Sequence, residues 1–384
     1  MKKIVLIILS VFCVVGYTNA KKQDTDYLAA ARRLAVAEIN RNADIFASPG
    51  DNVTWNYKLS FLNKAFLKLF NATGDSVCFL AAERVADYFV IPEGVKTYDQ
   101  TEYNMLNLNG GDFFYDLYLL NRGREYLNSM YVLRSQFYRQ PRTSDRIFCL
   151  SARDKGVVRI DEFMAFPFYS LYGAIFNEDV IFNDIAIQLE EIDKHTQDEK
   201  SRLNYYGWNE DKTQSWADKT TGLSPVIFSQ GQALFMMSIV DVLDYFPLNH
   251  GQRITLIRIF NRLAASAVKY QDKKTGMWYQ VTDKPRKGGN FRESSGTAMF
   301  VYSLAKGVNN GYLPEKYQKA AKKGFNGLLK NCVDSDGTVL MQSTSPADLK
   351  RTDASYNYYV NLPVVENDQL AIAAFILAAV ELSK

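Results

Sequence analysis

The sequence predicts an all-α protein and, more narrowly, a six-hairpin α/α barrel, a toroid in which inner helices lie within a ring of outer helices. Three observations favour this fold class. Apolar residues recur at steps of three and four along about twelve segments, a spacing typical of helices with one buried face. Glycine and proline punctuate these segments. No linker rich in proline or serine divides the 384 residues, so we expect residues 21–384 to form a single domain.

The periodic segments give the expected helices in chain order. In one of them, Leu256, Phe260 and Leu263 place an apolar stripe along one helix face. Gly74 and Pro247 are typical of the breaks between helices. The expected helices cover residues 25–40, 54–72, 75–90, 105–121, 123–139, 160–176, 179–195, 227–247, 250–271, 292–310, 314–332 and 364–383.

Three long connections remain between these helices, at residues 196–226, 272–291 and 333–363. Long loops in a compact helical domain usually carry function. The first two contain Trp208, Trp216 and Trp278, and little of the chain alternates as a strand would. We therefore expect the functional site among these loops.

The composition excludes several classes of protein. Lys and Arg number 45 against 42 Asp and Glu, which gives a formal net charge of +3. This near balance lacks the excess of basic residues that is typical of nucleic-acid-binding proteins. With two histidines and no HExxH, P-loop or dinucleotide fingerprint, we expect neither a metal nor a cofactor. Cys78, Cys149 and Cys332 are too widely spaced for a disulfide framework and are interpreted as small buried side chains.

The N-terminus has the features of a secretory signal peptide over residues 1–20. Lys2 and Lys3 precede an apolar stretch at residues 4–15, and small residues lead to a cleavage site after Ala20. No later stretch is long and apolar enough to span a membrane. We expect a periplasmic or secreted protein.

Asp161 is the first candidate for chemistry. It lies at the head of an expected helix among apolar neighbours, from Ile160 to Phe168. Apolar surroundings favour the neutral form of a carboxyl, which suits a general acid. The alternative is a helix cap or a partner of the helix dipole.

The loops supply candidates for binding a sugar. Tyr206 and Trp208 belong to a run of aromatic and amide side chains that can stack on a pyranose and hydrogen-bond its hydroxyls. Trp278 and Arg292 flank a second such run, in which Arg292 can clamp a carboxylate. Both runs have plain structural alternatives: a loop packed by its own aromatic rings, and a helix cap at Ser294 or Glu293. The acids before the last helix, Glu366 and Asp368, are interpreted as partners of its dipole.

These motifs together resemble the unsaturated rhamnogalacturonyl hydrolases of glycoside hydrolase family 105, relatives of family 88. The resemblance runs from about Trp55 to the C-terminus. It is carried by Trp208 with residues 216–219 and 221–225, and by further matches at residues 140–144, 240–247, 276–281, 299–300, 305–307, 311–313 and 363–368.

The resemblance implies the α/α barrel and a chemistry. The family acts on oligosaccharides ending in a 4,5-unsaturated uronic acid, where an Asp protonates C4 and activates water for C5 without a metal. Asp161 is the nearest match to that Asp. It lies one residue closer to Pro167 than expected, and an ungapped alignment places Ile160 there instead.

Other positions depart from the family pattern. Tyr206 replaces a His, Leu106 replaces a second acid, and Gln230 replaces the Arg that helps bind the uronate. Arg142, Arg159 and Arg292 are then the candidates for holding the substrate carboxylate.

The leading hypothesis is an exported glycoside hydrolase with an oligosaccharide substrate. The alternative is a non-catalytic carbohydrate-binding protein of the same fold. A sugar epimerase is disfavoured because such sites usually rely on histidine. The sequence indicates no partner other than carbohydrate and carries no signal for an oligomeric state.

Overall fold

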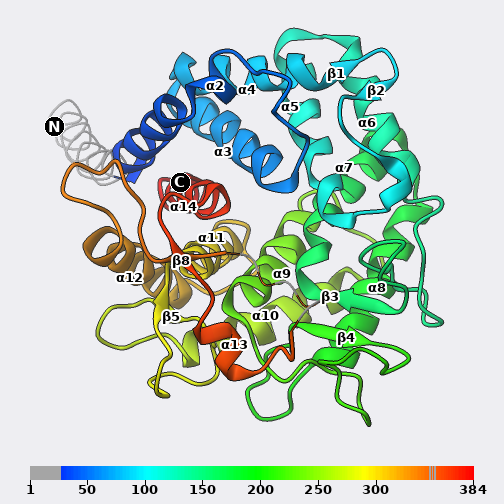
Figure 1. Ribbon diagram of the computed structural model, residues 1–384, viewed down its shortest axis with the longest axis vertical. Helices are drawn as coiled ribbons and strands as arrows, with labels where there is room; N and C mark the ends of the chain where they lie inside the picture. Colours follow the sequence, from blue (N-terminus) through cyan, green and yellow to red (C-terminus); the bar gives the residue numbers. More distant parts are fainter. Residues whose placement is uncertain (1–26, 346, 348, 350–351) are drawn as a thin grey trace, which may run out of the picture.

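The computed structural model describes residues 27–345, 347, 349 and 352–384. The predicted signal segment 1–20 therefore lies outside the described residues. Within them, helices alternate between an outer and an inner ring, which confirms the expected α/α barrel (Figure 1). Neighbouring inner helices contact one another around the ring, as α3 does with α14, α14 with α11 and α11 with α9.

The inner ring consists of α3 (Tyr57–Thr73), η2 (Met105–Gly110) continued by α5 (Gly111–Asn121), η3 (Ile160–Ala165) continued by α7 (Phe166–Phe176), α9 (Ser229–Val242), α11 (Ser294–Asn309) and α14 (Gln369–Leu382). The outer ring consists of a helix over residues 27–41, α4 (Ser76–Phe89), α6 (Arg124–Gln136), α8 (Val180–Thr196), α10 (Arg253–Lys269) and α12 (Lys316–Asn331).

The two rings differ in burial, and the sequence explains why. Every residue of α9 is buried, so its apolar residues surround the helix. In α10 burial is confined to one face, which includes Leu256, Phe260 and Leu263. A helix that is apolar all round is stable only when other elements enclose it, whereas an amphipathic helix leaves its polar face in water. The inner and outer positions follow from this difference.

The remaining described elements are short. They are α2 (Ala43–Phe46), η1 (Gln100–Glu102), α13 (Tyr356–Val360) and four antiparallel strand pairs, β1 (Val90–Ile91) with β2 (Gly94–Val95), β3 (Val157–Arg159) with β4 (Gly207–Asn209), β5 (Trp278–Tyr279) with β6 (Arg292–Glu293), and β7 (Ser343–Thr344) with β8 (Val364–Val365).

Some of these strands correct the expected helix starts. Residues 292–293 and 364–365 were expected to be helical but form strands that precede α11 and α14. The physical reason is that each helix begins after a capping carboxylate. Glu293 accepts hydrogen bonds from the backbone of Ser295 and Gly296, and Asp368 does so from Leu370 and Ala371.

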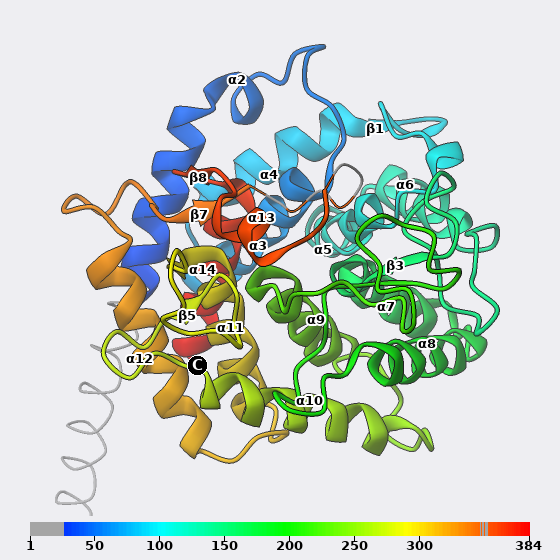
Figure 2. The same cartoon turned by 60° about the horizontal axis from the view of Figure 1, so that its bottom comes forward.

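Several short strands therefore gather at the end of the ring where inner helices begin. β3 runs directly into η3, and β6 runs directly into α11. Figure 2 shows β3, β5, β7, β8 and α13 lying over the inner helices on one side of the ring. The opposite end is formed by the C-terminal ends of the same helices. We call these the N-terminal end and the C-terminal end of the barrel.

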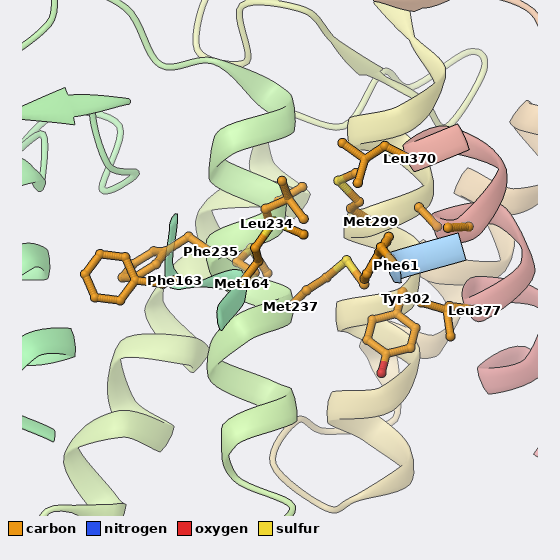
Figure 3. Packing of buried hydrophobic residues seen from close by; sticks show 14 of the residues in the cluster. Phe61, Phe163, Met164, Leu234, Phe235, Met237, Met299, Tyr302, Leu370 and Leu377 are labelled. Atoms are coloured by element: carbon orange, nitrogen blue, oxygen red, sulfur yellow. The ribbon is translucent and has the colours of Figure 1, made fainter. Parts of the chain in front are cut away.

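A plug of apolar side chains separates the two ends. Figure 3 shows Phe61, Met164, Leu234, Met299 and Leu370 packed across the space that the inner helices enclose. All five are buried. The middle of the ring is therefore filled by a packed apolar core.

Two smaller expectations concern cysteine and membranes. Cys78, Cys149 and Cys332 are free thiols and all are buried, which confirms their interpretation as core side chains. In the described part of the chain, no helix combines the length and apolar character that crossing a bilayer requires.

Candidate active site

Asp161 is positioned by the junction between β3 and η3 at the N-terminal end of the barrel. β3 pairs with β4 so that Arg159 lies opposite Gly207, and the Ile160 backbone N–H then donates to the Tyr206 carbonyl at 3.1 Å. This extended pairing ends where η3 begins, so Asp161 falls in the first turn of the third inner helix. Ile160, its apolar neighbour, is fully buried.

The Asp161 carboxylate accepts three hydrogen bonds. Arg159 donates through Nε to Oδ1 at 3.0 Å and through Nη2 to Oδ2 at 2.9 Å. The Tyr206 hydroxyl donates to Oδ2 at 2.9 Å. Asp161 is 8% exposed, so these bonds form largely out of water. A bidentate arginine–carboxylate pair is among the strongest hydrogen-bonded arrangements in proteins.

The other titratable groups around Asp161 are held neutral by burial. Burial raises the pKa of Tyr206 and Tyr57 well above the usual value for tyrosine, and the nearby Asp161 charge raises both further. The pKa of Tyr359 is shifted in the same direction, chiefly by burial. Burial also raises the pKa of Glu162 well above its usual range. These described neighbours therefore add no charge to the ion pair of Arg159 and Asp161.

Tyr206 reaches Asp161 because α9 leaves room for its ring. A side chain at Gly231, in the first turn of α9, would place its Cβ 2.3 Å from the Tyr206 Cδ2 atom. The ring also packs edge-on against Phe228 and Tyr359. This enclosure orients the hydroxyl toward Asp161. The position where the family pattern has a histidine thus still supplies a donor to the candidate acid.

Arg159 connects the carboxylate to the solvent-facing part of the site. It lines a polar hollow of about 240 Å³ and a smaller one beside it that reaches Trp216 and Leu349. The larger hollow is lined by Glu102, Asn104, Leu106, Leu150, Ser151, Arg153, Asp154 and Arg159. Polar lining with two arginines and several hydrogen-bonding groups is suited to an anionic sugar.

Two further predicted site residues lie in the segments that border this cluster. Trp208 follows Tyr206 on β4, pairs with Val158 and stacks on His195 with ring centroids 3.9 Å apart. Gln230, in the first turn of α9, donates from Nε2 to the Ser295 hydroxyl at 2.8 Å. Both are buried, so their described contacts are with protein rather than with an open surface.

Three predicted binding residues lie apart from the Asp161 cluster. Trp278 is fully buried, donates to the Ala267 carbonyl at 2.7 Å and packs on Phe300, so it is a core side chain and no sugar platform. Arg142 is held by Asp184 through two hydrogen bonds of 2.7 and 2.8 Å.

Arg292 lies on β6, with its guanidinium 6.0 Å from the centre of the Tyr279 ring. Trp278, Arg142 and Arg292 have residue types that a sugar site needs. The direction of each side chain, however, results from packing that the sequence pattern did not show.

The capping alternative is confirmed for Glu293, and Asp368, interpreted as a partner of the helix dipole, also acts as a cap. Glu293 caps α11, and Asp368 caps α14. Glu293 is fully buried, and its burial raises the pKa to about 7 despite the hydrogen bonds from Ser295 and Gly296 that favour the charged form. These two acids stabilise helix starts at the same end of the barrel as Asp161.

Comparison with known proteins is consistent with this architecture. The sequence model of glycosyl hydrolase family 88 matches residues 30–384. The chain belongs to this family. It is therefore a glycoside hydrolase, and an oligosaccharide is the expected class of substrate.

Solved structures extend the comparison. The family 105 glycoside hydrolase of C. acetobutylicum is 30% identical, with a TM-score of 0.85 over 91% of this chain and 99% of that one. This confirms the predicted resemblance to family 105. The unsaturated glucuronyl hydrolase of Bacillus sp. GL1 shares the fold at 12% identity, with a TM-score of 0.69 over 93% of this chain and 96% of that one.

Curated relatives match shorter parts of the chain. Protein Atu3128 of Agrobacterium fabrum is 27% identical over 230 residues, which span 57% of this chain and 97% of the relative. An unsaturated 3S-rhamnoglycuronyl hydrolase of Formosa agariphila is 30% identical over 115 residues, which span 30% of each protein.

The tyrosines that complete the cluster were missed at the level of sequence. Tyr57 opens α3 and Tyr359 belongs to α13, far from Asp161 in the chain. Neither has a distinctive motif. Arg159 could have been singled out among the three candidate arginines, because it lies two residues from Asp161 and opens the same helix.

Proposed function

We propose that the protein hydrolyses oligosaccharides that end in a 4,5-unsaturated uronic acid, with Asp161 as general acid and base. The observation that carries the proposal is the placement of Asp161. It is a nearly buried carboxylate at the N-terminal end of the barrel, held by Tyr206 and by Arg159, and Arg159 lines a polar hollow. The names of the relatives support the substrate class, since two are called unsaturated uronyl hydrolases.

The proposed reaction is a hydration. Protonated Asp161 donates its proton to C4 of the double bond, and water adds at C5 as the Asp161 carboxylate accepts the proton that the water loses. The product carries a hydroxyl at C5 and rearranges with release of the next sugar. One carboxyl serves both proton transfers and is regenerated, which is general acid–base catalysis.

The direct test uses unsaturated disaccharides prepared with several polysaccharide lyases. The purified protein is incubated with each, and the ultraviolet absorbance of the double bond is followed. We expect the absorbance to fall for at least one sugar. No loss for any of them at high enzyme concentration would contradict the proposal.

The same assay separates the hydrolase from a carbohydrate-binding protein. Calorimetric binding of an unsaturated disaccharide with unchanged absorbance would favour the non-catalytic interpretation. Under that interpretation Asp161→Asn would leave affinity nearly unchanged.

We also propose that residues 1–20 direct export to the periplasm or beyond. The charged start, the apolar stretch and the small residues before Ala20 support this location. N-terminal sequencing of the protein recovered from a periplasmic fraction would test it. We expect Lys21 as the first residue, and a cytoplasmic protein beginning at Met1 would contradict the proposal.

A further inference from the structure

We propose that Arg159 exchanges Asp161 for the carboxylate of the bound uronic acid, and that this exchange allows Asp161 to take up the proton it then donates. The inference rests on the proposed function and deepens it. It assigns Arg159 as the group that recognises the substrate carboxylate, and it makes a free carboxylate a requirement for catalysis.

The starting point is a conflict between the geometry and the proposed chemistry. A general acid must carry a proton, yet both Asp161 oxygens accept hydrogen bonds, two of them from a guanidinium. A guanidinium favours the charged form of a neighbouring carboxyl. In the free protein Asp161 is therefore arranged as a base, and an additional event must prepare it as an acid.

Arg159 has the free donors that such an event needs. Its Nε and Nη2 atoms bind Asp161, whereas the only contact of Nη1 among the described residues is a long one, 3.5 Å to the Ala347 carbonyl. A guanidinium has five N–H donors in a planar fork. Because Arg159 also lines both hollows, its unused edge is available to an anion that enters them.

The other candidate arginines are less suited to the substrate carboxylate. Arg142 is bidentate to Asp184, and neither residue lines the hollows beside Asp161. Arg292 lies beside Tyr279 on another strand pair. Gln230, at the position of the family's arginine, has no charge and is bonded to Ser295. Arg153 also lines the larger hollow and can contact the substrate carboxylate there, but the guanidinium that holds Asp161 belongs to Arg159.

The groups around Asp161 set its protonation once Arg159 moves its bonds. Tyr57, Tyr206 and Tyr359 are neutral because their pKa values are raised, and Glu162 is a buried carboxyl whose raised pKa favours its neutral form. None of them can replace the guanidinium charge. Burial favours the neutral form of a carboxyl, and the incoming uronate adds a like charge that acts in the same direction. Binding of the substrate thus favours protonation of Asp161 from solvent.

The exchange predicts a preference by substrate charge. An unsaturated uronide with a free carboxylate engages Arg159 and prepares Asp161. Its methyl ester has the same shape and double bond but no charge to draw Arg159 away. The enzyme should therefore favour the acid over the ester in kcat/KM, through an effect on kcat as well as on binding.

The decisive experiment measures proton uptake when a non-reactive uronate binds. The probe is an unsaturated disaccharide substrate whose double bond has been hydrogenated. Calorimetry near pH 7 in buffers of different ionisation enthalpy counts the protons taken up. We expect close to one proton per bound ligand for the natural protein and none for Asp161→Asn. No binding, binding without uptake, or equal uptake by Asp161→Asn would overturn the exchange.

A kinetic experiment on the acid and its methyl ester tests Arg159 itself. We expect the natural protein to favour the acid by 100-fold or more in kcat/KM and Arg159→Gln to favour it by less than tenfold. Equal discrimination by both proteins would overturn the assignment. Should Arg159→Gln fail to fold, the proton count with Asp161→Asn still decides, because that substitution preserves the shape of the side chain.

The two proposals fail in different ways. Absence of turnover on every unsaturated uronide contradicts the hydrolase proposal. Turnover of the acid together with binding that takes up no proton contradicts the Arg159 exchange alone and leaves the hydrolase proposal standing.

Discussion

The two ends of the barrel hold buried ion pairs of different kinds. At the C-terminal end Asp241 meets two lysines, Lys64 at 3.3 Å and Lys306 at 2.6 Å, and Lys306 also pairs with Asp244 at 2.5 Å. At the N-terminal end the candidate acid, Asp161, pairs with Arg159. The first arrangement shares its charges among several helices, whereas the second is a single pair.

This contrast indicates a different role for each end. Burial raises the pKa of Asp241, but Lys306 and Lys64 outweigh it and leave the pKa below its usual range. The Tyr302 hydroxyl also donates to Asp241 at 2.7 Å. This network joins α3, α9 and α11 and stabilises the ring. This network also lines a hollow, of about 330 Å³, but Asp241 and Lys306 are bonded to several partners there. Arg159 has one carboxylate partner and, among the described residues, a single long contact at Nη1, so its pair can rearrange when a ligand binds.

The largest expected effect is a loss of activity on substitution at the N-terminal end. Asp161→Asn should lower kcat by about 10³- to 10⁴-fold, because it removes the group that transfers the proton. The loss of double-bond absorbance measures it. Asp184→Asn is the matched control, since Asp184 also forms a bidentate pair with an arginine. Equal losses of kcat in Asp161→Asn and Asp184→Asn would contradict a special role for the pair of Arg159 and Asp161.

The next effect is at the C-terminal end. Lys306→Met should destabilise the fold by about 4 kcal/mol, because it removes the positive charge that pairs with the carboxylates of Asp241 and Asp244 and leaves their desolvation less well offset. Urea unfolding measures the change. Lys194→Met is the control, because the Lys194 side chain is 73% exposed and its partner, Glu191, is also partly exposed. Its effect should stay below about 1 kcal/mol. A similar cost for both lysines would show that the buried network has no special role.

A smaller effect concerns the pH dependence of stability. Burial raises the pKa of Glu293 from its usual 4.5 to about 7, so the folded state binds a proton that the unfolded state releases between these values. Stability should therefore be highest below about pH 4.5 for this group and fall by up to about 3 kcal/mol as pH rises through 7.

Glu293→Gln keeps the side chain neutral and should flatten that dependence. Urea unfolding at pH 4.5, 6 and 8 compares the two proteins. Parallel curves for the natural protein and the variant would contradict the role of Glu293.

The smallest effect tests the support that Tyr206 gives to Asp161. Tyr206→Phe removes one hydrogen bond to the carboxylate and should reduce kcat/KM about tenfold, by the magnitude for a hydrogen bond to a charged group. Tyr205→Phe is the control, because its hydroxyl contacts Asp198 at 3.2 Å rather than the Asp161 cluster. If the two variants lost activity equally, Tyr206 would have no particular part in positioning Asp161.

Much of the fold could be predicted because it depends on local patterns. The expected helix at 250–271 contains α10, since Leu256, Phe260 and Leu263 define one buried face. The helix starts at 292 and 364 were misplaced, because a short strand pair with a distant segment overrides the local helical pattern there. Asp161 was singled out by its apolar neighbours and its family motif, both of which are local.

The partners of Asp161 required the tertiary structure. Tyr206 comes from a connection 45 residues away, and its hydroxyl meets Asp161 because Gly231 leaves space for the ring. Trp278 has the residue type of a sugar platform, yet its indole N–H bonds Ala267 within the core. Residue type alone does not reveal which way an aromatic side chain points.

The helical periodicity, the number of hairpins and the candidate acid are already contained in the order of the residues, because they depend on the spacing of apolar side chains and on short motifs. The folded ring was needed to establish that Arg159 is held by Asp161 while its remaining donors face a hollow, and that Arg142 is held elsewhere. The physical reason is that the direction of a side chain and the identity of its charged partner depend on elements distant in the chain, which meet when the ring closes.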